Sequence, residues 1–207
     1  PRRADRGAGD DARHDAGGDV PVNDARPDPS RVRLIALDSD GTLTERGIFW
    51  DDQGVGSRRF DVRDGLAMTW AVQVGIPVVV ISGKSVPALD ARLADLGVPG
   101  FQGVLDKPAC LAGFAAEHGM TLADCAFLGD DLPDVPVMRQ VGYSMAVADA
   151  HPLVHAVAAW RAPSAGGYGA AREAIEHLLV ATGRWDLVLA RYDARGLALP
   201  AAAGPFE

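Results

Sequence analysis

The chain has 207 residues, 48% of them hydrophobic and 23% charged, which is the size and composition of one globular domain with a sizeable core. Its formal net charge of −8 argues against a general nucleic-acid binder, which needs a basic face to neutralise phosphates. No apolar run approaches the roughly 20 residues of a membrane span, and the first thirty residues contain no apolar stretch of the signal-peptide kind.

Residues 1–30 mix Asp, Arg, Gly and Pro with few large apolar groups, so we expect a disordered leader or linker there. The folded domain is expected over 31–199, followed by a flexible tail over 200–207. The two cysteines, Cys110 and Cys125, show no metal-ligand spacing and suggest no disulfide framework. We therefore expect a cytoplasmic protein.

Short apolar runs and helical patterns alternate along the domain. A β-hairpin is predicted where 47–50 and 55–60 flank a turn-like stretch of Asp, Gln and Gly. A helix capped by Asp64 is expected to run to near Gly75. The other predicted helices cover 86–96, 108–118, 132–141 and 168–182, and the predicted strands cover 32–37, 76–81, 100–104, 125–128 and 143–147. This alternation predicts a three-layer α/β fold with a doubly wound parallel sheet and a protruding hairpin.

Polar residues stand just past the ends of three predicted strands. Asp38, Ser82 and Asp130 each follow an apolar run, and open α/β sheets bind ligands at the carboxyl ends of their strands. Asp38 and Asp40 are two residues apart, so an extended backbone can point both carboxylates into one pocket. By itself such a pair is more often a solvated, Asp-rich turn, and its position beside the other groups is what favours a site.

These groups suit the hydrolysis of a phosphate ester. A carboxylate that attacks a phosphate monoester needs a cation on the phosphoryl oxygens, and hard oxygen ligands beside a phosphate are the usual setting for Mg²⁺. Ser82 can donate a hydrogen bond to a phosphate oxygen, and Lys107 can balance its charge. Asp40 can protonate the leaving alcohol and later activate water. A second acidic cluster supplies further oxygens at Asp130, Asp131 and Asp134.

Lysine is scarce in this chain. Of the 20 basic residues only Lys84 and Lys107 are lysines, and the rest are arginines. Because lysine offers a compact ammonium and arginine a wide planar fork, a retained lysine marks a place where arginine does not substitute.

At these residues the sequence resembles the haloacid dehalogenase superfamily of phosphatases. Four motifs occur in order: DxDGT at Asp38, a hydrophobic strand that ends in Ser82, then Lys107, then GDDxxD from Gly129. The resemblance implies a magnesium-dependent phosphatase in which Asp38 is the nucleophile and Asp40 the acid/base. It also implies metal ligands from Asp38, the Asp40 carbonyl and Asp130, with Asp131 and Asp134 in supporting roles.

The spacing between the motifs leaves no room for a cap domain, so the chain is similar to the capless members of the superfamily. Within them it resembles the 3-deoxy-D-manno-octulosonate 8-phosphate phosphatases, through the stretches 60–65, 129–131, 147–152 and 166–173. That resemblance implies a sugar-acid phosphate as substrate, a role in lipopolysaccharide biosynthesis, and a homotetramer joined at its hairpins. The substrate-binding residues that it implies are Asp40, Asp61, Val62, Arg63, Asp64, Gly65, Lys84, Arg92 and Lys107.

One departure from the family pattern leaves alternatives open. This chain has Ser82-Gly83-Lys84 where those phosphatases carry Ser/Thr-Gly-Arg. A nine-carbon, sialic-acid-type 9-phosphate is therefore a competing substrate. A third alternative is a non-catalytic tetramerisation module, of the kind fused to nucleotidyltransferases.

Overall fold

A computed structural model describes residues 27–195 of the protein. Its main sheet has the strand order β5-β4-β1-β6-β7-β8, and all neighbouring strands in it run parallel. The four central strands are buried along their whole length because each is a short, mostly apolar run. The strands are β1 (Leu34–Leu37), β4 (Val78–Ile81), β5 (Gly100–Phe101), β6 (Cys125–Gly129), β7 (Tyr143–Ala146) and β8 (Trp160–Arg161).

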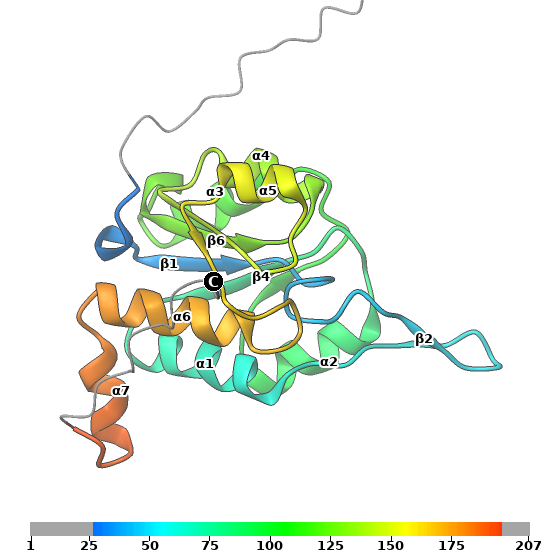
Figure 1. Ribbon diagram of the computed structural model, residues 1–207, viewed down its shortest axis with the longest axis horizontal. Coiled ribbons are helices and arrows are strands. Elements are labelled where there is room, and N and C mark those ends of the chain that lie inside the picture. Colours follow the sequence, from blue (N-terminus) through cyan, green and yellow to red (C-terminus); the bar gives the residue numbers. More distant parts are fainter. Residues whose placement is uncertain (1–26, 196–207) are drawn as a thin grey trace, which may run out of the picture.

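Helices cover both faces of this sheet, so the fold has the three layers that the sequence predicted (Figure 1). One face carries α1 (Val62–Gln73), α2 (Pro87–Leu96) and α6 (Ala170–Ala181). The other carries α3 (Lys107–Glu117), α4 (Val135–Met138) and α5 (Pro152–Val157). The remaining elements are α7 (Trp185–Arg191), which packs against α6, and the 3-10 helices η1 (Pro29–Arg31), η2 (Leu122–Asp124) and η3 (Leu132–Asp134). Among residues 27–195, every helix is too short or too polar to cross a membrane.

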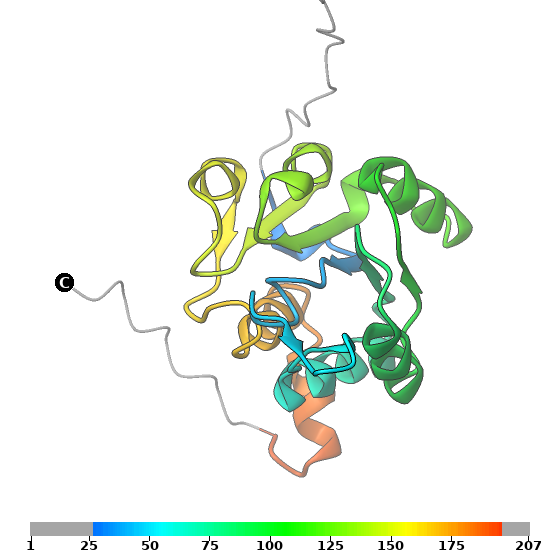
Figure 2. The same cartoon turned by 90° about the vertical axis from the view of Figure 1, so that its right-hand side faces the viewer.

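The predicted hairpin is present and projects beyond the C-terminal end of β1 (Figures 1 and 2). Its strands, β2 (Phe49–Trp50) and β3 (Gly56–Ser57), are antiparallel but shorter than predicted. The turn is closed by the Asp51 carboxylate, which accepts a hydrogen bond from the Val55 amide (2.8 Å). Gly54 adopts a positive φ of 77°, which suits glycine at the end of such a turn.

Two helices differ from the prediction. Asp61, not Asp64, caps α1, and its carboxylate accepts a hydrogen bond from the Arg63 amide (2.8 Å). Asp64 instead lies buried in the first turn of α1. The single helix predicted over 132–141 is divided into η3 and α4, because Pro136 has no amide hydrogen to continue an uninterrupted helix.

Besides the 3-10 helices η1 and η2, the sequence did not predict α5, β8 and α7. They contain six, two and seven residues, so none is long enough to show a clear hydrophobic period. β8 adds a sixth strand at the edge of the sheet beside β7.

Regular structure is present just before Arg31. Asp28 accepts a hydrogen bond from the Ser30 amide (2.9 Å) and caps η1, which starts at Pro29. The rest of the expected leader and the expected tail over 200–207 lie outside the described residues. Cys110 and Cys125 are both free thiols, and Cys125 is buried.

Candidate active site

The C-terminal ends of β1, β4 and β6 bring polar residues to one edge of the sheet. Asp38 directly follows β1, Ser82 follows β4 and Asp130 follows β6. Since β1 lies between β4 and β6, these side chains border one cavity of about 220 Å³. Its lining consists of Asp38, Asp40, Ser82, Gly83, Lys84, Lys107, Asp130, Asp131, Pro133 and Asp134.

Lys107 joins two of the acids in this cavity. Asp106 caps α3 by accepting a hydrogen bond from the Ala109 amide (3.0 Å), which places Lys107 in the first turn of that helix. The Lys107 ammonium donates to Asp38 Oδ1 (2.5 Å) and to Asp134 Oδ1 (2.6 Å). The three side chains are only 4%, 9% and 2% exposed. A compact ammonium satisfies two carboxylates in this space, where a planar guanidinium is wider.

Asp134 and Asp131 hold the turn that follows β6. Asp134 uses its second oxygen, Oδ2, to accept hydrogen bonds from the amides of Asp130 (2.9 Å) and Asp131 (3.3 Å). The Asp131 carboxylate caps η3 by accepting a hydrogen bond from the Leu132 amide (2.8 Å). Both oxygens of Asp134 are therefore engaged, and the two acids fix the position of Asp130.

Asp130 packs against the backbone that follows β1. A Cβ atom at position 41 would lie 2.1 Å from Asp130 Oδ2, and Gly41 has a φ of 92°, so only glycine is compatible with this approach. Asp130 Oδ1 lies 3.4 Å from the Thr42 hydroxyl, and Oδ2 accepts a hydrogen bond from Arg46 Nη2 (3.2 Å). Arg46 also pairs with Asp149, which follows β7.

Asp40, the predicted acid/base, is held by an arginine from the hairpin. Arg58 Nε donates to Asp40 Oδ1 (2.6 Å) and Arg58 Nη2 donates to Oδ2 (3.3 Å). The Arg58 side chain is only 5% exposed, and its residue comes directly after β3. The base of the hairpin thus contacts the cavity through a two-pronged ion pair.

The cavity carries an excess of buried negative charge. Burial and the neighbouring Asp134 charge raise the pKa of Asp38 well above its ordinary value, and Lys107 opposes them. Burial and Asp134 also raise the pKa of Asp130 to about 6, with Arg46 acting in the opposite direction. Burial alone would lower the pKa of Lys107, but Asp38 and Asp134 outweigh it and raise this pKa, so the ammonium stays charged.

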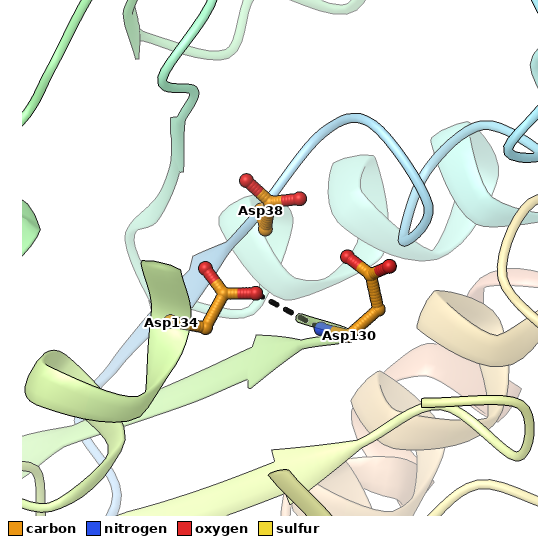
Figure 3. A group of neighbouring side chains, drawn as sticks. All are labelled: Asp38, Asp130 and Asp134. Atoms are coloured by element: carbon orange, nitrogen blue, oxygen red, sulfur yellow. Dashed lines mark hydrogen bonds between the residues drawn. The ribbon is translucent and has the colours of Figure 1, made fainter. Parts of the chain in front are cut away.

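The donor set fits a hard divalent cation. Carboxylate oxygens of Asp38, Asp130 and Asp134 lie within 4.8 Å of one another, and all three residues are buried (Figure 3). Mg²⁺ prefers oxygen ligands of this kind, and a dication relieves the repulsion that raises the acid pKa values. Asp134 is held by Lys107 and also by two backbone amides, whereas the partners of Asp38 and Asp130 are side chains that can move away, so Asp38 and Asp130 are the carboxylates with capacity to bind the metal.

Ser82 and Lys84 lie on the opposite side of the cavity. Ser82 is 2% exposed, and its hydroxyl oxygen accepts a hydrogen bond from the Lys84 amide (3.2 Å). Lys84 itself is exposed at the cavity rim. Within the described part of the chain, no acidic side chain lies within ion-pair distance of its ammonium.

The other predicted substrate-binding residues lie elsewhere in the chain's own structure. They gather at the start of α1 and beside α2, around a separate pocket of only about 10 Å³. Asp61, Asp64, Gly65 and Arg92 line it, whereas Val62 and Arg63 are exposed on the surface. The structure of one chain therefore does not bring these six residues to the catalytic cavity.

Asp64 links α1 to α6. Its Oδ1 accepts a hydrogen bond from the Arg172 amide (2.8 Å), while its buried Oδ2 has no hydrogen-bond partner among the described residues. Burial raises the pKa of Asp64 to about 6. This position between two helices indicates a packing role for the carboxylate within one chain.

Arg46 and Arg58 were missed by sequence reasoning. Each holds an acid of the cavity, yet neither belongs to a motif, and both lie among many arginines of the same type. The only signal was their position, Arg46 just before the predicted hairpin and Arg58 within its second strand, which by itself does not say where a side chain points.

A haloacid dehalogenase-like hydrolase family model matches residues 101–173, the part of the chain that contains Lys107 and the acidic cluster after β6. Among curated proteins, the 3-deoxy-D-manno-octulosonate 8-phosphate phosphatase KdsC of Escherichia coli K12 is 38% identical over 156 residues. That alignment spans 75% of this chain and 83% of the relative. The corresponding protein of Yersinia pestis is 37% identical over 153 residues, or 73% of this chain and 82% of the relative.

Solved structures agree with this relationship. The 3-deoxy-D-manno-octulosonate 8-phosphate phosphatase of Moraxella catarrhalis, in complex with magnesium, phosphate and KDO, has a TM-score of 0.76 and 33% identity. The match covers 79% of this chain and 95% of that one. The cobalt-bound deoxy-D-mannose-octulosonate 8-phosphate phosphatase of Haemophilus influenzae has a TM-score of 0.73 and 34% identity, over 77% and 94% of the two chains.

Proposed function

The chain belongs to the 3-deoxy-D-manno-octulosonate 8-phosphate phosphatase family of haloacid dehalogenase-like hydrolases, and from this premise we propose that it is a magnesium-dependent phosphatase. It hydrolyses 3-deoxy-D-manno-octulosonate 8-phosphate to the free sugar acid and phosphate. The observation that carries the proposal is the buried cluster in which Lys107 bridges Asp38 and Asp134 beside Asp130. The nucleophile, its counterion and the metal ligands are thereby brought together at the C-terminal ends of the central strands.

The Asp38 and Asp130 carboxylates, together with the Asp40 backbone carbonyl, would hold the Mg²⁺ ion. When bound, the ion supplies positive charge at the phosphoryl oxygens and offsets their repulsion from the acids. Lys107 adds a second fixed positive charge on the same side. The Ser82 hydroxyl oxygen accepts a hydrogen bond from the Lys84 amide, which leaves the hydroxyl hydrogen available. Ser82 can therefore donate this hydrogen to a phosphate oxygen.

In the first chemical step an Asp38 oxygen attacks the phosphorus atom and forms an acyl phosphate. The bond from phosphorus to the sugar oxygen breaks, and Asp40, which takes up a proton from solvent once Arg58 has released it, gives that proton to the sugar oxygen as the alcohol leaves. Asp40 therefore has to exchange Arg58 for the leaving group, because Arg58 engages both carboxylate oxygens. The hairpin that carries Arg58 is thus part of the catalytic cycle.

In the second step water attacks the phosphorus atom of the phospho-aspartate. Asp40, now ionised, takes a proton from that water, and the bond between phosphorus and the Asp38 oxygen breaks. Inorganic phosphate leaves and the Asp38 carboxylate is restored. Lys107 stays charged throughout and prevents Asp38 and Asp134 from repelling each other.

A phosphate-release assay over a panel of substrates tests this function. The panel contains the eight-carbon 8-phosphate, a nine-carbon sugar acid 9-phosphate and a small aryl phosphate, each with Mg²⁺ and with EDTA. We expect the highest kcat/KM for the eight-carbon compound and no turnover with EDTA. A preference for the nine-carbon compound would assign the alternative substrate that Lys84 leaves open.

Absence of turnover on every compound would favour the third alternative, a non-catalytic tetramerisation module. Conversely, a phospho-aspartate trapped on Asp38 would exclude that module. The presence of Asp38, Asp40, Lys107 and Asp130 in one cavity supports the enzyme, since a structural module has no use for buried, mutually repelling acids.

The proposed assembly is a homotetramer joined by its hairpins. Apolar side chains stay exposed on the hairpin of a single chain, and burying them against other copies would remove that surface from water. They are Ile48, Phe49, Trp50 and Val55. A neighbouring chain placed there would also complete the pocket with substrate-binding residues that one chain keeps apart from its own cavity. Light scattering tests this, because a fully active monomer contradicts it. The cytoplasmic location stays a prediction.

A further inference from the structure

Asp130 has a different counterion from the other buried acids. Lys107 pairs with Asp38 and Asp134, and its ammonium makes no ion pair with Asp130. Within residues 27–195, the one cation within ion-pair distance of Asp130 is Arg46, at 3.2 Å from Oδ2. The metal-free site therefore depends on Arg46 to neutralise the acid that follows β6.

Arg46 is placed so that it can give up this contact at small cost. Its side chain is 45% exposed, whereas that of Asp130 is 4% exposed. The other arm of the guanidinium pairs with Asp149, which is itself fixed by a hydrogen bond from the Gly166 amide (3.0 Å). Releasing Asp130 leaves Arg46 with Asp149 and with water.

We propose that Arg46 is the metal-free counterion of Asp130 and that Mg²⁺ displaces it, so that Arg46 lowers the affinity of the site for the metal. Two positive groups compete for one buried carboxylate, and the guanidinium also repels a dication through space. This inference rests on the proposed metal site. It identifies Arg46 as a residue that controls metal affinity without binding the metal.

The test is isothermal titration calorimetry of Mg²⁺ into the metal-free protein, without substrate. Arg46→Ala should bind Mg²⁺ about three- to tenfold more tightly than the wild type, as expected for removing a partly exposed competing charge. Arg46→Lys keeps the charge but loses the fork, so its Kd should lie between the two. The matched control is Arg33→Ala, since Arg33 is 53% exposed and pairs with Asp124 at the opposite end of β1. It should bind Mg²⁺ like the wild type.

Thermal unfolding with and without Mg²⁺ gives a second readout. Without metal, Arg46→Ala should have a lower Tm than the wild type, because Asp130 loses its counterion. With saturating Mg²⁺ the difference should shrink, since the ion replaces the lost charge. A purely structural role for Arg46 would keep the difference constant, as we expect for Arg33→Ala.

Unchanged or weaker Mg²⁺ binding by Arg46→Ala overturns the inference, and weaker binding would mean that Arg46 orients Asp130 for the metal. These outcomes leave the proposed function intact. A wild-type protein that binds no Mg²⁺ would overturn the proposed metal site and this inference together.

Discussion

The two ends of the parallel strands contrast in chemistry, and the end with the reactive groups does not have the larger cavity. At the C-terminal end, a cavity of about 220 Å³ is bordered by buried acids, a buried lysine and a buried serine. At the opposite end, a larger cavity of about 310 Å³ lies between α1, α2 and α3. Its lining is mostly apolar and consists of Val72, Gly75, Pro77, Val78, Gly97, Pro99, Phe114 and His118.

This contrast shows that volume does not identify the reactive end of the sheet. His118, the one titratable group in the larger cavity, is occupied by packing: its Nδ1 lies 2.9 Å from the Phe114 carbonyl oxygen, and its ring packs on Phe114. At the other end, charged groups converge from three strand ends and one helix start. Buried charges that need one another, in a set of carboxylates that fits a dication, mark the site.

The largest difference between the ends should appear in turnover. Asp38→Asn keeps the side-chain shape but removes the nucleophile, so kcat for phosphate release should fall by at least about 1,000-fold. His118→Ala at the opposite end should leave kcat unchanged and cost about 1 kcal/mol of stability through lost packing. Near-normal turnover by Asp38→Asn would eliminate the covalent mechanism.

Buried charge should also dominate stability at the C-terminal end. Lys107→Met removes the cation shared by Asp38 and Asp134 and leaves two buried acids unpaired, which should lower the free energy of unfolding by about 3 kcal/mol. Urea denaturation at neutral pH measures this. Lys84→Met is the matched control, since its ammonium is exposed, and a loss as large in this variant would refute the argument.

Asp64 tests whether burial of an acid at this end is costly without a cation. Its pKa is raised from 3.8 to about 6 on folding, so the folded state holds the proton more tightly than the unfolded state. The contribution of Asp64 to the free energy of unfolding is therefore fully present below pH 3.8 and is lost as the pH rises through about 6. Asp64→Asn keeps the acceptor for the Arg172 amide and removes that loss.

The measurement for Asp64 is urea unfolding of both proteins between pH 4 and pH 7. A rise in pKa from 3.8 to about 6 changes the free energy of unfolding by roughly 2 kcal/mol between pH 4 and pH 7, so the stability of Asp64→Asn relative to the wild type should rise by about that amount across this range. Parallel pH profiles of the two proteins would show that Asp64 ionises freely in the folded state.

The smallest effect should come from Lys84, at the exposed rim of the catalytic cavity. If its ammonium contacts the substrate carboxylate, Lys84→Ala should raise KM for the sugar-acid phosphate about tenfold, or roughly 1.4 kcal/mol. Hydrolysis of a small aryl phosphate, which has no carboxylate, should hardly change. Equal loss on both substrates, or loss on neither, would remove Lys84 from the substrate-binding residues.

The sequence predicted the parts of the molecule that local pattern determines. The runs before Asp38, Ser82 and Asp130 are apolar and short, so buried strands and the edge they share could be inferred. The cap of α1 was assigned to Asp64 in place of Asp61, because two aspartates three residues apart give the same local signal and only packing against α6 decides between them.

Contacts between distant arginines and acids could not be predicted in the same way. Arg58 reaches Asp40 and Arg46 reaches Asp130 because both arginines lie at the base of the hairpin, beside the C-terminal ends of the strands, and nothing in the residue types distinguishes these arginines from the others. The short elements α5 and β8 were missed for a related reason, since their positions are set by the neighbouring sheet and not by a period of their own.

The central position of β1 has a consequence for synthesis. β4, its neighbour on one side, begins at Val78, but β6 on the other side begins only at Cys125. Until β6 has left the ribosome, β1 presents an unpaired edge with four apolar side chains, the kind of edge that joins to another chain. Nascent chains that stall before Cys125 should therefore aggregate and need chaperones. The synthesis of β6 covers the open edge of β1 and, directly after it, supplies Asp130 to the site.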